Sequence, residues 1–229
     1  MADIFDEVRE DLRAERTSAL LKRYGGLLVA ALVVVLVAVG GWQLWRTQQA
    51  KKADAAAGSF LSAMRSADAL PLGPSPNRLP AADAFAAVAA SAPDSYRVLA
   101  RLREASLRAD AGDVAAADAL WDRVSQDNAA PRLLRDLANL LWAQHGIDRG
   151  DPAAVQTRLD TLTAPENPWR PLAQEAQAWL ALRLGHRDDA QRILTQLATD
   201  AAAPDGLRGR ANSLLTLFKD GPKDLETRG

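Results

Sequence analysis

The amino-acid sequence predicts an all-α protein in which a single N-terminal transmembrane helix is followed by an array of helical repeats, an α-solenoid. Three observations predict this fold class. One segment is long, apolar and uncharged. Alanine is abundant, and strand-like runs of β-branched residues are missing outside that segment. The soluble part of the chain also resembles itself at a fixed offset.

The uncharged segment covers residues 25–45, with Tyr24 before it and Trp42 and Trp45 at its end. From Tyr24 to Trp45, a helix of about 22 residues spans roughly 33 Å, which is enough to cross the hydrocarbon core of a bilayer. Aromatic residues at both ends are typical of the membrane interface. We therefore expect a transmembrane helix at residues 24–46.

A cleaved signal peptide is the alternative interpretation of this segment. Such a peptide has a basic start and an apolar core of about 7 to 15 residues. The core here is longer, and residues 1–23 are rich in Asp and Glu. These features favour an uncleaved anchor.

The charges that flank the segment bear on its orientation. Four basic residues precede the segment and three follow it, namely Arg13, Arg16, Lys22 and Arg23 before it and Arg46, Lys51 and Lys52 after it. Because the positive-inside rule counts only Lys and Arg near the ends, charge alone gives a slight bias toward a cytoplasmic N-terminus. We expect the soluble part outside the cytoplasm.

Composition narrows the range of functions. The chain has 229 residues, a formal net charge of -1 and no cysteine. There is no basic excess that would suggest nucleic acid binding, and without cysteine the chain has no disulfide or thiolate chemistry.

The sequence predicts five segments along the chain. They are a cytoplasmic amphipathic helix (1–23), the transmembrane helix (24–46), a connecting helix with a Pro-rich loop and the first helical pair (47–94), a repeat array with a capping helix (95–219) and a mobile tail (220–229).

The N-terminal helix carries a narrow apolar stripe formed by Ile4, Phe5, Val8 and Leu12. This helix is either a polar extension of the anchor or a docking helix for a partner. Because its charges nearly cancel, attraction to anionic lipid is not expected. The stripe is our candidate docking site.

The soluble part repeats itself. When the sequence is shifted by 73 residues, residues 95–141 fall on residues 168–214, and roughly one third of the aligned positions are identical. Some alanine matches are expected by chance. Matches such as Gly112 with Gly185 and Pro131 with Pro204 are harder to explain without a repeat.

Each copy contains two helix pairs, so one unit has about 36 residues, close to the 34 residues of the tetratricopeptide repeat (TPR). A glycine ends the first helix, and a proline opens the next pair. Small alanines should let the helices approach, while residues such as Leu99 and Trp121 fill the seams. The expected helices are 47–70 with 81–92, 95–110 with 114–127, 131–146 with 152–163, 168–184 with 187–200, and a cap at 206–219.

No catalytic motif is present. The sequence lacks a phosphate-binding loop, Gly-x-Ser-x-Gly, His-Glu-x-x-His and an acidic calcium loop. His145 and His186 are the only histidines, and each is expected near a helix end in a structural or incidental role. We expect a protein that is not an enzyme, with no catalytic, cofactor-binding or metal-binding residues.

A candidate partner-binding groove is formed by Arg97, Arg101, Glu104 and Arg108 on one helix face, with Arg170 as the repeat of Arg97. On the first helix of a TPR unit, such a face can line a concave groove. The alternative is a solvated face with an internal Glu104–Arg108 pair.

A second pattern recurs in both copies. Asp127 stands eight residues before Arg135, and Asp200 stands eight residues before Arg208. We predict that each pair clamps the turn between helices, and the alternative is a contact with a ligand.

Several sequence motifs resemble the bacterial ancillary SecYEG translocon subunit family, a membrane-anchored TPR-like group related to a periplasmic cell-division coordinator domain. The resemblance covers nearly the whole chain. It implies a cytoplasmic N-terminus, a periplasmic repeat domain, and association with the Sec translocon and a membrane-anchored periplasmic chaperone. The motifs are DIFDEV and ERTSALLKRYGG before the apolar segment, GGW at its end, NPWR at 167–170 and APDGLRGRA at 203–211.

The expected function is therefore a non-enzymatic scaffold in the bacterial inner membrane. It would link the Sec translocon to periplasmic chaperones, with emerging polypeptides as further partners. The alternatives are a subunit of another envelope assembly, for cell division or wall synthesis, and an accessory subunit of a membrane enzyme. The oligomeric state stays open.

Overall fold

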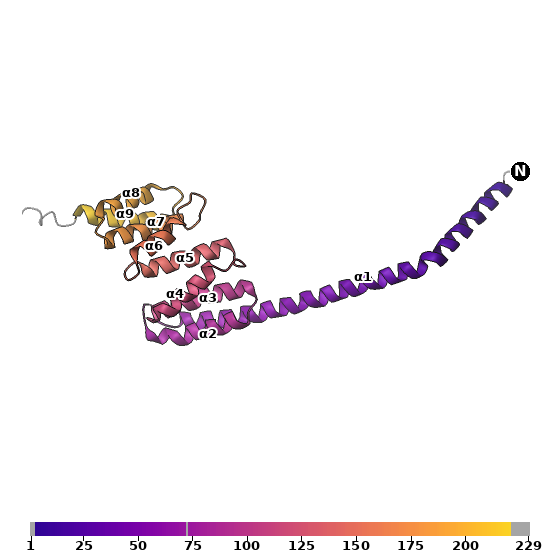
Figure 1. Cartoon of the computed structure of the whole chain (residues 1–229), viewed down its shortest axis with the longest axis horizontal. Coiled ribbons are helices and arrows are strands. Elements are labelled where there is room, and N and C mark those ends of the chain that lie inside the picture. The colour runs from indigo at the N-terminus through magenta and orange to yellow at the C-terminus, as the bar shows by residue number, and fades with distance from the viewer. Residues whose placement is uncertain (1–2, 72, 221–229) are drawn as a thin grey trace, which may run out of the picture. The chain divides into compact units, whose positions relative to one another are not determined.

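A computed structural model describes the backbone of residues 3–71 and 73–220, while the side chains of residues 3–25, 27, 28, 31, 219 and 220 lie outside the described part. All regular secondary structure of the described residues is helical, which confirms the predicted all-α class (Figure 1). The chain divides into two units, residues 1–54 and residues 55–229. The long helix α1 (Asp3–Asp68) begins in the first unit and supplies the first helix of the second.

The first unit contains the apolar segment. Residues 32–52 are all exposed, and the described large apolar side chains from Val29 to Trp45 have exposed fractions of 52 to 70%. Because a helix turns once in 3.6 residues, these side chains cover every face of the helix.

Two predictions fall on this first unit. Among the residues that the structure describes, no helix has the length and apolarity that a membrane crossing requires. The transmembrane helix therefore stays a prediction. The docking stripe of Ile4, Phe5, Val8 and Leu12 lies on α1, but its side chains are outside the described residues.

The second unit is a stack of helices in which each packs on its neighbours in the chain (Figure 1). The predicted helix 47–70 is the last part of the continuous helix α1, and the helices predicted after it are all present, with ends that differ by a few residues. After α1 they are the 3₁₀ helix η1 (Pro76–Arg78), α2 (Leu79–Ser91), α3 (Asp94–Asp110), α4 (Val114–Ser125), α5 (Arg132–Gly146), α6 (Pro152–Asp160), α7 (Arg170–Arg183), α8 (Arg187–Thr199) and α9 (Asp205–Asp220).

The two sequence copies fold alike, with α3, α4 and α5 equivalent to α7, α8 and α9. Gly112 and Gly185 have φ angles of 88° and 78°, the left-handed conformation that glycine adopts most easily. At both turns the glycine N–H donates to the carbonyl three residues earlier, and the next N–H donates to the carbonyl five residues earlier. This is the Schellman motif, which satisfies carbonyls at the helix end. The predicted glycine caps are confirmed.

The core is divided among successive helix pairs rather than gathered in one centre. The end of α1 packs on α2 through Ala63 and Ala67, with Phe85 fully buried between the helices. Trp121 is the largest side chain of the next cluster and is also fully buried. Alanines at the predicted close approaches have exposed fractions of 0 or 1%, and they are Ala100, Ala105, Ala117, Ala173, Ala178 and Ala190.

Leu99 is an exception to the predicted packing. It was expected in a seam between helices, but 38% of it is exposed. The neighbouring Val98 and Ala100 are buried instead, and Leu102 on the same helix is buried as predicted, so Leu99 lies at the edge of the packed face of α3.

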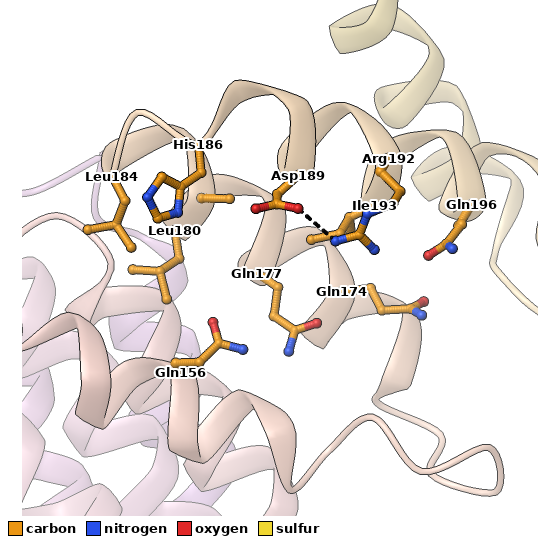
Figure 2. Close-up of a pocket in the computed structure, with 11 residues that line it drawn as sticks. Gln156, Gln174, Gln177, Leu180, Leu184, His186, Asp189, Arg192, Ile193 and Gln196 are labelled. Atoms are coloured by element: carbon orange, nitrogen blue, oxygen red, sulfur yellow. Dashed lines mark hydrogen bonds and ion pairs between the residues drawn. The ribbon is translucent and has the colours of Figure 1, made fainter.

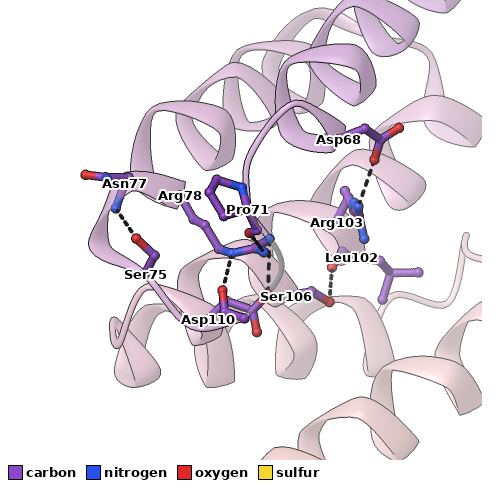
Figure 3. A network of polar contacts seen from close by, with 10 residues as sticks. Asp68, Pro71, Ser75, Asn77, Arg78, Leu102, Arg103, Ser106 and Asp110 are labelled. Atoms are coloured by element: carbon purple, nitrogen blue, oxygen red, sulfur yellow. Dashed lines mark hydrogen bonds and ion pairs between the residues drawn. The ribbon is translucent and has the colours of Figure 1, made fainter.

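A buried arginine fixes the loop between α1 and α2 (Figure 3). Arg78 donates hydrogen bonds of 2.7 and 2.8 Å to the carbonyls of Pro71 and Gly73, and its guanidinium lies 3.5 Å from Asp110 on α3. Backbone carbonyls need hydrogen-bond partners when they are removed from water, and Arg78 supplies partners for these two. This arrangement holds the loop against α3.

The first helices of the pairs, α3, α5, α7 and α9, also contact one another in series. The second helices, α4, α6 and α8, form no comparable row. The stack is therefore tighter along the first helices than along the second helices. A cleft opens over α7, between the second helices α6 and α8.

Candidate protein-binding surface

Two of the five predicted groove residues form a buried ion pair. Glu104 is buried and accepts a hydrogen bond of 2.8 Å from Nε of Arg108. Arg108 also contacts Asp83 on α2 and Asp113 at the start of α4. The hydrogen bond to Glu104 raises the pKa of Arg108 above its usual value. Arg108 therefore ties three helices together.

The other three residues of the predicted groove are arginines, and each also pairs with an aspartate. This pairing gives all five residues a structural role, and their part in partner binding stays a prediction. The pairs are Arg97 with Asp94 at 2.7 Å, Arg101 with Asp127 at 3.8 Å, and Arg170 with Asp200 at 2.6 Å.

The predicted clamps across the turns are wrong. Among the described residues, neither Asp127 nor Asp200 forms an ion pair with the arginine eight residues later. Each aspartate instead accepts a hydrogen bond from the backbone N–H two residues on, at 3.0 and 2.8 Å. This is the turn that Asp side chains favour, and it leaves the second carboxylate oxygen facing an arginine on the first helix of the pair, α3 for Asp127 and α7 for Asp200.

We call the first open surface the glutamine cleft. It lies over α7, between α6 and α8, and has a volume of about 360 Å³ (Figure 2). Four carboxamide side chains line it together with apolar residues that include Leu180, Leu184 and Ile193. The carboxamides are Gln156 of α6, Gln174 and Gln177 of α7, and Gln196 of α8.

Charges in the glutamine cleft are neutralised locally. Asp189 accepts a hydrogen bond of 2.8 Å from Arg192, which lowers the pKa of the Asp189 carboxyl. Gln156 and Gln177 donate to the same oxygen of Asp160, at 2.7 and 2.8 Å. The cleft thus presents amide groups and apolar surface rather than an unpaired charge.

A second surface, the tryptophan groove, lies between α7 and α9. It has a volume of about 470 Å³ and is lined by Trp179, Leu214 and the small residues Gly206, Gly209 and Ser213. Trp179 is 43% exposed. At the edge of the groove Arg210 donates two hydrogen bonds, of 2.8 and 2.9 Å, to Glu175.

Sequence reasoning missed both surfaces. Trp179 falls opposite Ser106 in the repeat alignment, so its difference from the first copy was a usable signal. Gln174 and Gln177 lie three residues apart and therefore share a helix face, but Gln156 and Gln196 come from other helices. Only the packing of α6, α7 and α8 brings these four together.

A family model described as a tetratricopeptide repeat-like domain matches residues 19–210. The chain belongs to this family. No curated protein and no solved structure matches the chain.

Membership of the TPR-like family supports a role in binding proteins. Arrays of this kind stack repeats into extended surfaces on which partners bind. In the described part of the chain, no cluster of three or more His, Asp or Glu residues is placed to hold a metal ion. His145 stacks on Trp121 with ring centroids 4.9 Å apart, and His186 is exposed at the start of α8.

Proposed function

We propose that the protein is a non-enzymatic scaffold anchored in the bacterial inner membrane, with its N-terminus in the cytoplasm and its TPR-like array in the periplasm. In this proposal it is an ancillary subunit of the Sec translocon that brings periplasmic chaperones to the exit of the channel. The anchor concentrates the array at the membrane, where weak contacts become effective.

The observation that carries the proposal is the surface of α1. Its apolar side chains between Val29 and Trp45 are exposed on all faces of the helix. A helix that is apolar all round is stable when it is surrounded by lipid or by protein, because water would otherwise contact the whole apolar surface. The TPR-like family match begins at residue 19, before this segment.

The choice of the Sec translocon as the partner is supported by sequence motifs alone. The motifs before the apolar segment, together with NPWR and APDGLRGRA, resemble the ancillary SecYEG translocon subunit family. In the array, the NPWR residue Asn167 is buried and donates to Asp136, and Trp169 donates a hydrogen bond of 2.9 Å to the carbonyl of Leu133. These residues position α7 on α5, so they support the shape of the array more directly than its partner.

Site-specific photocrosslinking in intact cells tests the proposal. A photoreactive residue replaces Ser213, which lines the tryptophan groove, in the full chain. A matched variant carries it at Thr157, which is exposed on α6 and lies outside both surfaces. We expect translocon or chaperone adducts from position 213 in excess over position 157.

The identity of the adducts separates the alternatives. Division or wall-synthesis proteins at position 213 would replace the translocon with another envelope assembly. A membrane enzyme as the main adduct would indicate an accessory subunit. Equal labelling from both positions, with no protein enriched at either, would overturn the scaffold proposal.

A further inference from the structure

Three unpaired cations follow the apolar segment of α1. From residue 25 to residue 53 the only charged residues are Arg46, Lys51 and Lys52, and all three are positive. Their side chains are exposed. Within the part of the chain whose side chains the structure describes, none of the three forms an ion pair. The helix therefore presents a purely positive surface directly after Trp45.

The position of these cations is not explained by membrane topology. In the proposed orientation, the N-terminus lies in the cytoplasm and the three cations lie on the outer side of the membrane. The positive-inside rule describes an excess of Lys and Arg on the cytoplasmic side, so cations at this end oppose the orientation rather than set it. A negatively charged ligand on the outer side would give them a role.

The three cations surround the helix and do not share one face. A helix turns by about 100° per residue, so Lys51 and Lys52 lie about 140° and 240° around the axis from Arg46. A protein partner that docks on one face of α1 would not reach all three. Lipids, in contrast, surround a membrane helix on every side. This ring of Arg46, Lys51 and Lys52, which we call the basic collar, therefore matches lipid better than a docked protein.

Helix geometry directs the side chains of the basic collar toward the apolar segment. In an α-helix each Cα–Cβ bond tilts toward the N-terminus, and long side chains extend over the preceding turn. Arg46 follows this rule, since its Cζ atom lies 5.7 Å from the ring centroid of Trp42, four residues earlier. A cation over an indole ring at this distance is attracted by the ring. Because the apolar segment precedes the collar, the charged ends are carried toward the membrane.

The height of the basic collar matches the headgroup layer of a bilayer. The polar layer adds about 5 to 8 Å on each side of the hydrocarbon core. At 1.5 Å per residue, Arg46 lies roughly 2 Å beyond Trp45, and Lys52 lies roughly 10 Å beyond it. Long Lys and Arg side chains lay their apolar stems along apolar surface and place the charge at the interface. The collar can thus reach the layer that contains the lipid phosphates.

We propose that the basic collar binds the headgroups of anionic phospholipids in the outer leaflet. This inference rests on the proposed membrane anchor and adds the class of ligand and the residues that bind it. A zwitterionic headgroup carries its own cation beside the phosphate, whereas an anionic headgroup such as phosphatidylglycerol leaves the phosphate charge uncompensated. Each Lys or Arg near an anionic membrane surface strengthens binding, so three cations select anionic lipid.

The experiment uses the full chain in lipid nanodiscs that contain equal amounts of phosphatidylglycerol and phosphatidylcholine. The discs are dissolved in a neutral detergent, and native mass spectrometry counts the lipids of each class that stay on the chain. We expect phosphatidylglycerol to exceed phosphatidylcholine by about tenfold or more. A higher salt concentration during the transfer should reduce this excess, because salt screens interactions between exposed charges.

Variants of α1 locate the lipid. Lys51→Gln combined with Lys52→Gln should lower the excess by about tenfold, whereas Lys51→Arg combined with Lys52→Arg keeps both charges and should retain it. Arg65→Gln is the matched control, because Arg65 is an exposed cation of the same helix, roughly 30 Å beyond Trp45. It should retain lipid as the unmodified chain does. Every substituted side chain is exposed, so the buried contacts of the array stay intact.

Four results would overturn the proposal. They are equal retention of both lipids by the unmodified chain, an excess that survives the two glutamine substitutions in the collar, loss of the excess in Arg65→Gln, and displacement of the lipid by free glycerol phosphate. The last result would make the collar a site for soluble phosphate compounds.

Failure of this inference differs from failure of the proposed function. A chain that enters the nanodiscs and retains both lipids equally is anchored without selecting its lipid. A chain that does not enter the nanodiscs has no membrane anchor, and the proposed function and this inference are then both wrong.

Discussion

The carboxylate of Asp200 accepts a hydrogen bond of 2.6 Å from Nη2 of Arg170. Arg170 is the first residue of α7, and Asp200 follows the last residue of α8, so the bond closes the open end of this helical hairpin. Gly185 forms the turn at the other end. In the first copy, Asp127 and Arg101 close the equivalent hairpin at a longer distance of 3.8 Å.

The closure by Arg170 and Asp200 predicts a measurable coupling. Both side chains are about one fifth exposed, at 23 and 22%, so we expect a coupling free energy of no more than about 1 kcal/mol. The measurement is a double-mutant cycle in thermal unfolding with Arg170→Ala and Asp200→Asn. Arg208→Ala serves as the control, because Arg208 contacts the backbone carbonyl of Asp200, at 3.4 Å, and pairs with the carboxylate of Asp205 rather than with that of Asp200. If the coupling between Asp200→Asn and Arg208→Ala were larger than the coupling between Asp200→Asn and Arg170→Ala, then Asp200 would pair with Arg208, and the assignment to Arg170 would be wrong.

Glycine substitutions should change stability in opposite directions at two positions. An added Cβ meets no atom within 4 Å at either Gly112 or Gly209. The backbone conformation alone therefore decides whether the substitution raises or lowers the free energy of unfolding. Gly112 has a φ of 88°, and Gly112→Ala should lower the free energy of unfolding by about 1 kcal/mol. Gly209 lies inside α9, where alanine favours the helix more than glycine does. Gly209→Ala should therefore raise the free energy of unfolding by about 0.5 to 1 kcal/mol. Urea unfolding of both variants checks the prediction, and a shift of the same sign in both would contradict it.

His145 should make stability dependent on pH. Burial lowers the pKa of His145 below its usual value, and the carboxylates of Asp110 and Asp118 only partly oppose this effect. In the unfolded chain the pKa is about 6.5, so below that pH the unfolded state binds more protons than the folded state. The free energy of unfolding should therefore fall as the pH decreases from 6.5 toward the lower pKa of the folded state.

The matched variant for this prediction is His145→Gln, which keeps a polar side chain beside Trp121 without a titrating ring. Melting temperatures measured between pH 7.5 and pH 5.5 should fall more steeply for the unmodified chain than for the variant. Parallel curves would mean that His145 keeps its ordinary pKa.

The helices were predictable because their signals are local. Gly112 and Gly185 mark caps, and Pro131 and Pro204 mark starts, through backbone preferences that act within a few residues. The repeat alignment then required both copies to fold alike.

The surfaces were less predictable because they depend on packing between helices. The ion-pair partners of Asp127 and Asp200 depend on how the two helices of each pair pack together. The spacing along the chain instead suggested the arginines eight residues later, which are not the partners. The four carboxamides of the glutamine cleft come from three helices and share no sequence spacing. No local pattern distinguishes them from solvated glutamines elsewhere.

We propose that residues 24–46 anchor the array in the membrane with its C-terminal end outside the cytoplasm. Protease accessibility of the full chain in spheroplasts, with different tags at Met1 and Gly229, tests it most directly. We predict that external protease removes the C-terminal tag, while the N-terminal tag stays protected on a short fragment in the membrane pellet. Recovery of the chain in the soluble fraction, or protection of both tags until the membrane is opened, would contradict the claim.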